Sequence, residues 1–140
     1  MWQPVAGRRF DLVVANLPHF PMDRREVLGR RATWSAGGNS GRTLLDRFID
    51  GLDAHLAPGG RAVITHNAFV DVERTRQMLH ERGMTMTVVQ SILAGIPDEK
   101  MDRLTPSVLA SEMGKTLHRF GPYCFGEVKV IEIARVEAHG

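Results

Sequence analysis

The spacing of apolar residues changes several times along this chain, and each change marks an expected element. The continuous apolar run at 12–15 is typical of a strand buried on both faces, and Asn16 ends it. The next apolar series has helical spacing and predicts one buried helix face, made of Leu45, Phe48, Ile49, Leu52 and Leu56. The segment 56–65 then reads as a helix end, a tight turn at Pro58-Gly59-Gly60 and a second buried strand.

The second half of the chain continues the alternation. Asp71 can cap a helix that runs through Arg82 and stops at Gly83. We expect a strand at 84–92, an irregular stretch at 94–103, a helix at 105–120 and a final strand at 127–136. This order predicts an α/β fold with a doubly wound sheet, in which ligands collect at the carboxyl ends of the strands.

Composition limits the class of protein. The chain has 140 residues, of which 43% are hydrophobic and 24% charged, as in a globular protein with one domain spanning 1–140. No apolar run approaches the roughly 20 residues that cross a bilayer, and the N-terminus lacks a signal peptide's apolar core, so no membrane partner and a cytoplasmic location are expected. Cys124 is the single cysteine and reads as a small buried hydrophobe. No metal site is expected, because the histidines are scattered.

The net charge of +2 is small, but the arginines are clustered. Pairs at Arg8-Arg9, Arg24-Arg25 and Arg30-Arg31 flank the loop that follows the first strand. They could contact the phosphates of a nucleic acid, or they could be solvated surface residues. Both interpretations remain open from the sequence.

Candidate chemistry lies in the loop Asn16-Leu17-Pro18-His19, which directly follows the first strand. This tetrad resembles the Asn/Asp-Pro-Pro-Tyr/Phe signature of class I S-adenosylmethionine-dependent methyltransferases that modify planar nitrogen atoms. The resemblance implies that the side-chain oxygen of Asn16 and the carbonyl of Pro18 accept the hydrogens of the acceptor nitrogen. It also implies that His19 and Phe20 pack on the plane of the acceptor. Leu17 replaces the first proline of the signature, and His19 replaces its aromatic residue.

The resemblance extends through the rest of the chain. The glycine-rich loop at 36–41 with the helix after it, and the Leu-x-Pro-Gly-Gly sequence at 56–60, are similar to the family's "small" methyltransferase domain. The family's Gly-rich cofactor loop would lie upstream of the signature, so the chain resembles the C-terminal half of a Rossmann-like methyltransferase. The resemblance implies a mostly parallel sheet with an antiparallel last strand, and S-adenosylmethionine as cofactor. Trp2 matches a position near the cofactor's adenine.

Other polar residues are candidates for the same site. His66 and Asn67 follow the second predicted strand, so they face the same rim as Asn16 and could bind substrate together with Leu17 and Phe20. A hydrogen-bonded turn is the alternative interpretation for His66 and Asn67. The glycine-rich loop could bind phosphate or simply start a helix, although its spacing differs from that of a P-loop.

The sequence thus predicts an S-adenosylmethionine-dependent methyltransferase that modifies a nitrogen of a protein, a nucleic acid or a small molecule. The alternative is a non-catalytic, methyltransferase-like interaction domain that pairs with another chain. In either case the run at 12–15 would leave an apolar sheet edge, which usually recruits a further strand. We therefore expect a homodimer or a completing partner chain.

Overall fold

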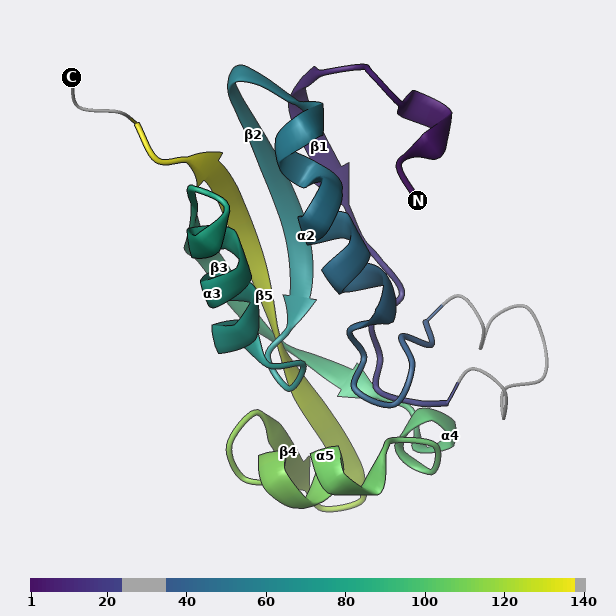
Figure 1. Cartoon of the computed structure of the whole chain (residues 1–140). Helices are drawn as coiled ribbons and strands as arrows, with labels where there is room; N and C mark the ends of the chain where they lie inside the picture. Colours follow the sequence, from purple (N-terminus) through teal and green to yellow (C-terminus); the bar gives the residue numbers. More distant parts are fainter. Residues whose placement is uncertain (24–34, 138–140) are drawn as a thin grey trace.

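The computed structural model describes residues 1–23 and 35–137, and Figure 1 shows their arrangement. The arginine pairs Arg24-Arg25 and Arg30-Arg31 lie outside the described residues. No helix in the described part of the chain is long and apolar enough to cross a membrane.

The described chain forms one five-stranded sheet. Its strands are β1 (Phe10–Ala15), β2 (Leu56–Asn67), β3 (Met84–Ile96), β4 (Leu117–Phe120) and β5 (Tyr123–Arg135). The order across the sheet is β1-β2-β5-β3, and the short β4 extends it by pairing with β5. The helical elements are η1 (Gln3–Val5), α2 (Thr43–His55), α3 (Val72–Glu81), α4 (Asp98–Met101) and α5 (Pro106–Glu112).

The strand directions confirm the expected α/β class. β1 pairs parallel with β2, and β5 pairs antiparallel with both β2 and β3. β1, β2 and β3 therefore run in one direction. β5, the last strand in sequence, lies between β2 and β3 and runs in the opposite direction. This is the mostly parallel sheet with an antiparallel last strand that the sequence resemblance implied.

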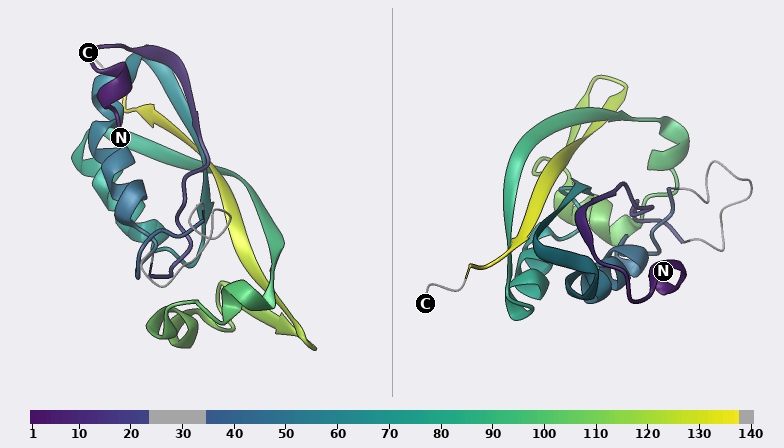
Figure 2. Two further views of the ribbon diagram at one scale, coloured as in Figure 1. Left: turned by 90° about the vertical axis from the view of Figure 1, so that its right-hand side faces the viewer. Right: turned by 90° about the horizontal axis from the view of Figure 1, so that it is seen from above.

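Helices α2 and α3 pack on the same face of the sheet (Figure 2). The helical spacing in α2 places Leu45, Phe48, Ile49 and Leu52 in the core, as predicted. In α3 the side chain of Asp71 accepts a hydrogen bond from the backbone N–H of Arg74, which confirms the expected cap. Opposite them, Ile131 and Ile133 of β5 point into the same core.

The turn expected at Pro58-Gly59-Gly60 is present, but it lies inside β2 rather than before it. The pairing with β1 jumps from Phe10↔Leu56 to Leu12↔Arg61, so residues 57–60 bulge out of the ladder. Gly59 has a φ of 73°, a left-handed conformation that favours glycine. Leu56 thus begins the strand instead of ending the helix.

The helix predicted for 105–120 is wrong in its second half. α5 ends at Glu112, and Gly114 follows in the left-handed region with a φ of 84°. Leu117 is buried as predicted, but it lies in β4, where it pairs with Gly126 of β5. A glycine inside the predicted helix and the hairpin between β4 and β5 therefore overrode the helical spacing.

Two strand boundaries also differ from the prediction. β3 continues through Ile96, and β5 begins at Tyr123, because residues 94–96 pair with residues 124–126. Gly95 was expected to break the chain, yet it pairs with Phe125 inside this ladder. The remainder of the segment expected to be irregular contains α4.

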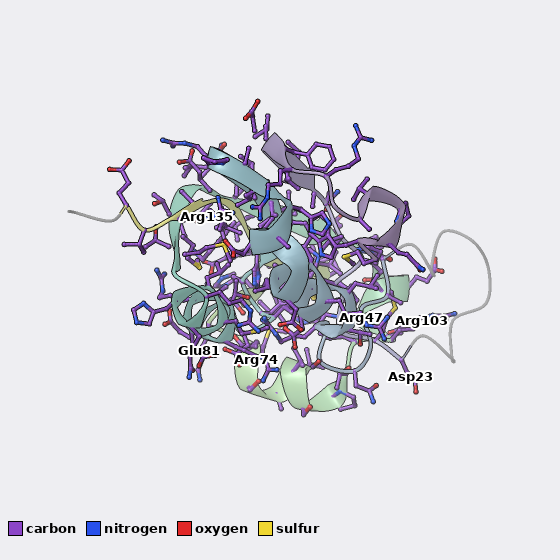
Figure 3. All side chains as sticks on the ribbon, turned by 45° about the horizontal axis from the view of Figure 1, so that its top comes forward. Asp23, Arg47, Arg74, Glu81, Arg103 and Arg135 are labelled. Atoms are coloured by element: carbon purple, nitrogen blue, oxygen red, sulfur yellow. The ribbon has the colours of Figure 1, made fainter. Side chains whose placement is uncertain are left out.

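Two side chains, one at each end of the sheet, fix it to its surroundings. Arg135, labelled in Figure 3, donates hydrogen bonds to the carbonyls of Ala57 and Leu56 and pairs with Asp53, so it ties the end of β5 to the junction of α2 and β2. At the other end, Thr105 donates from Oγ1 to the carbonyls of Pro21 (3.1 Å) and Asn39 (2.5 Å). These bonds attach the start of α5 to the loop after β1.

The outer edge of β1 is open in the described structure. β1 is the terminal strand of the sheet, and its side chains alternate between the helix-covered face and the opposite face. Leu12 and Val14 point to the opposite face and are 59% and 71% exposed. The expected apolar sheet edge is therefore present, but the prediction of a strand buried on both faces is wrong, because only one face of β1 is covered.

Candidate active site

The carboxyl ends of β1 and β2 bring the predicted site residues together. Because the strands are parallel and Ala15 lies beside Ile64, Asn16 and Thr65 become neighbours. The hydroxyl of Thr65 donates to Oδ1 of Asn16 at 2.6 Å. This bond orients the exposed amide, and an amide oxygen retains a second lone pair that can accept another hydrogen bond.

His19 is buried, and both of its ring nitrogens have partners within the chain. Its Nε2 lies 2.8 Å from the backbone N–H of Asn67 and must accept that hydrogen. Its Nδ1 lies 2.5 Å from the carbonyl of Leu17 and therefore donates. The neutral tautomer with hydrogen on Nδ1 satisfies both contacts, so His19 joins the loop after β1 to the end of β2.

His66 lies behind His19 and is completely buried. The two rings meet edge to face at 5.9 Å. Nδ1 of His66 donates to the carbonyl of Asn67 at 2.8 Å, and Nε2 accepts from the hydroxyl of Thr75 at 2.7 Å. A connected series of hydrogen bonds therefore runs from the site into helix α3.

Arg42 completes this buried network. Its Nη2 donates to Oγ1 of Thr75 at 2.9 Å, which leaves the threonine hydroxyl hydrogen for His66. Its Nη1 donates to the carbonyls of Val70 and Asp71, and its Nε pairs with Asp46 at 2.8 Å. The guanidinium therefore satisfies the backbone that leads into α3.

Burial keeps both histidines neutral. Desolvation lowers the pKa of His66 from 6.5 to about 4, because the charged ring would lose its contact with water. Burial also lowers the pKa of His19, and the hydrogen bond to Leu17 opposes this effect. Neutral rings suit the donor and acceptor roles that the geometry requires.

The glycine-rich loop packs against the backbone of His19. A Cβ atom on Gly37 would come within 2.5 Å of Cα of His19, and one on Gly41 would come within 2.5 Å of its carbonyl oxygen. The glycines are therefore explained by a close approach of two backbones. Nothing in this contact requires the phosphate-binding interpretation of the loop.

A cavity of about 430 Å³ opens at this end of the sheet. Its wall includes Asn16, Leu17, His19, Phe20 and Asn67 among the residues predicted from the sequence. The volume and the mostly apolar lining with a few polar groups are those of a small-molecule site. The other lining residues are Ser35, Thr65, Phe69, Ile92, Ala94, Gly95, Ile96, Pro97, Lys100, Gly126 and Val128.

Three predicted residues lie away from this wall. His66 is buried behind it, and Pro18 is not among the lining residues. Trp2 stacks on Phe48 and His55 of helix α2, with ring centroids 5.1 and 4.3 Å away. Its indole N–H donates to the carbonyl of Phe48. The role of Trp2 beside a cofactor stays a prediction.

The aromatic wall and the lysine were not predicted as a group. Phe20 and Phe69 meet edge to face at 5.9 Å, and the ammonium of Lys100 lies 5.2 Å from the centre of the Phe20 ring. Lys100 belongs to α4, in a segment expected to be irregular. Its position depends on β3 reaching Ile96 and directing the chain back towards β1, which no local sequence signal reveals. Thr65 could have been found, because it precedes His66 at a strand end.

The described pocket does not fit the whole of S-adenosylmethionine. That molecule carries an ammonium, a sulfonium and one carboxylate. No carboxylate lines the part of the cavity that the structure describes, so its two positive groups find no counter-ion there, and the charged side chain on the wall is the cation Lys100. The apolar and aromatic wall instead suits a flat acceptor. Arg8 and Arg9, the described arginine pair, lie at the opposite end of β1 from Asn16, where Arg9 donates to the carbonyl of Leu56.

No protein-family model matches the sequence, and no curated protein matches it either. Among solved structures, the fold is similar to the E. cuniculi Mtq2–Trm112 complex, which is responsible for methylation of the eRF1 translation termination factor, with a TM-score of 0.48 and 17% identity. It is also similar to precorrin-6y C5,15-methyltransferase from Geobacter metallireducens, with a TM-score of 0.44 and 14% identity.

These alignments cover 90% and 92% of this chain but only 52% and 46% of the respective structures. The chain thus spans about half the length of the two proteins. Both structures are of methyltransferases or their complexes. The likeness is too weak to assign an activity to this chain.

Proposed function

We propose that this chain provides the acceptor-binding half of an S-adenosylmethionine-dependent methyltransferase. The observation that carries the proposal is the placement of Asn16, in the signature-like loop, on the wall of a cavity at the carboxyl end of β1. Thr65 orients the amide so that Oδ1 can accept a hydrogen from an amide or amino nitrogen. Such nitrogens have delocalised lone pairs and must be aligned before they attack a methyl group.

The other loop residues support this assignment. The carbonyl of Pro18 is the second acceptor that the signature implies, and Pro18 itself lies next to the lining residues Leu17 and His19 rather than on the described wall of the cavity. His19 uses its ring nitrogens within the chain, which makes it a positioning residue that fixes the loop to Asn67. Phe20 and Phe69, which meet edge to face, then provide an aromatic wall for the acceptor.

The cofactor's charged end must be held by groups outside the described cavity wall. The open edge of β1 lies beside Asn16, and unpaired apolar edges usually recruit another strand. We therefore place the completing segment there, from a second copy or from another chain that pairs with β1. The acceptor is a nitrogen of a protein, a nucleic acid or a small molecule.

Calorimetric titration of the full chain with S-adenosylhomocysteine tests the proposal. At protein concentrations where the chain is associated, we expect micromolar binding. The Asn16→Ala variant should keep this binding but transfer a tritiated methyl group about a hundredfold more slowly to a glutamine peptide or an adenine-containing oligonucleotide, because the nitrogen is no longer aligned.

The matched control is Asn39→Ala, an exposed asparagine in the glycine-rich loop whose side chain makes no contact with the cavity. Transfer by Asn16→Ala at the rate of this control would remove the role assigned to Asn16. Absence of cofactor binding at millimolar ligand would mean that the chain is either a half-domain completed by another chain or a non-catalytic interaction domain. The inward-facing ring of His19, which replaces the family's substrate-stacking aromatic, is the observation that favours that second candidate.

A further inference from the structure

Lys100 is the cation on the described wall of the cavity. Its side chain leaves α4 and crosses the ring of Phe20, with the ammonium 5.2 Å from the ring centre. The residue is partly buried, and burial lowers the pKa of its ammonium group because water is removed from the charge. Coulombic repulsion from Lys100 also lowers the pKa of His19, so the charge of the ammonium is felt by a buried ring of the site.

This charge has no carboxylate partner among the described residues, whereas six arginines elsewhere do. The arginines that form an ion pair with an aspartate or glutamate are Arg42, Arg61, Arg74, Arg76, Arg82 and Arg135. The acidic residues nearest in sequence to Lys100, Asp98 and Glu99, are exposed, and neither lines the cavity. A partly desolvated cation without a counter-ion is costly, so a negative group from a ligand would be stabilised there.

We propose that the ligand of this cavity carries a carboxylate beside a flat unsaturated group, and that the ammonium of Lys100 binds the carboxylate. The proposal deepens the function proposed above, because it rests on the same cavity and names the class of acceptor. One uncompensated positive charge matches one negative charge, which favours a carboxylate over a phosphate dianion. The phenyl rings of Phe20 and Phe69, which meet edge to face, provide the adjoining aromatic wall.

The geometry separates the two ends of such a ligand. Lys100 comes from α4, whereas Asn16 comes from the end of β1, and both belong to the wall of the same cavity. When the carboxylate of the ligand is bound at Lys100, another part of the same ligand would face Asn16 and Thr65. In this arrangement Lys100 determines which molecule binds, and Asn16 orients the nitrogen.

The test compares two probes of nearly equal shape, 2-naphthoate and the neutral 2-naphthamide, by calorimetry or by chemical-shift titration of the full chain without cofactor. We expect wild type to bind the naphthoate about tenfold more tightly, the effect of one charge-assisted hydrogen bond. Lys100→Gln should bind both probes equally, and Lys100→Arg should retain the preference. The exposed Lys115→Gln is the matched control and should behave as wild type.

A third probe, 2-naphthyl phosphate, distinguishes the kind of anion, and it should bind no more tightly than the naphthoate. Equal affinities of wild type for naphthoate and naphthamide would overturn the proposal, as would an unchanged preference in Lys100→Gln. Because no cofactor is present, these results are independent of methyl transfer. A chain that selects the carboxylate but transfers no methyl group would refute the proposed function and leave this inference intact.

Discussion

At the scale of single residues, the buried imidazoles define how the site responds to acid. His19 and His66 are neutral in the network that joins the loop after β1 to helix α3. A proton on Nε2 of His66 would face the hydroxyl of Thr75, to which Arg42 donates, so the network favours the neutral ring. Protonation of these imidazoles must therefore lower the stability of the folded chain.

We expect the free energy of unfolding to decrease as the pH is lowered from about 6.5 to about 4. The folded pKa of His66 is about 4, below the unfolded value of 6.5. The unfolded chain thus binds the proton first, and the stability present above pH 6.5 is lost as pH falls towards 4. The shift corresponds to about 3 kcal/mol from this residue alone. Urea unfolding measured at pH 7.5, 5.5 and 4.5 would show it.

The variant His66→Gln should weaken this dependence, because glutamine does not titrate. The exposed His80→Gln provides the control and should leave the slope unchanged. A His66→Gln slope equal to that of wild type would show that His66 does not carry the effect. His19 contributes in the same direction, since burial lowers its pKa as well.

At the scale of elements, the glycine-rich loop positions the loop that carries the site. Gly37→Ala would place Cβ within 2.5 Å of the backbone of His19, which cannot move without losing its bond to Asn67. We expect a loss of about 2 kcal/mol of stability, typical of overpacking. Gly95→Ala is the control, because its nearest neighbour would be Phe125 at 3.9 Å. Equal unfolding free energies of the two variants would contradict the close-packing explanation.

The sequence predicted the elements whose signals are local. The apolar run of β1, the helical spacing of α2 and the Asp71 cap of α3 all lie where expected. It failed where pairing with β5 decides the structure. Gly95 pairs with Phe125 rather than breaking β3, and Leu117 belongs to β4 rather than to a helix, because β5 supplies partners for both segments.

The same distinction applies to the site. Asn16 and Asn67 follow predicted strand ends, so parallel pairing alone brings them to one rim. Lys100 and Phe69 arrive through β3, α4 and the turn after β2, whose paths are set by tertiary contacts. The Arg42–Thr75–His66 network joins three elements and has no signature in the sequence.

At the scale of the whole molecule, the open edge of β1 predicts association. Leu12 and Val14 are exposed beside an unpaired strand edge, and we expect the purified chain to form dimers or larger species in light scattering. The double variant Leu12→Lys/Val14→Lys should lower the measured mass to that of a monomer, since charges on an edge oppose pairing. Val136→Lys, another exposed apolar position, is the control.

A wild-type chain that is strictly monomeric and monodisperse across the micromolar range would count against this association. Retention of the associated mass in the double variant would place the contact elsewhere on the surface. Loss of cofactor binding together with the loss of association would link the edge to the completed site.

The insertion of β5 between β2 and β3 has a consequence for synthesis on the ribosome. β2 and β3 do not pair with one another in the described sheet, so each keeps a free edge until residues 123–135 are available. During translation, β1, β2 and α2 can collapse early, but the sheet closes only after β5 has left the exit tunnel. Such late, long-range closure slows folding and exposes the nascent edges to other chains, so chaperone dependence should be greatest just before β5 emerges.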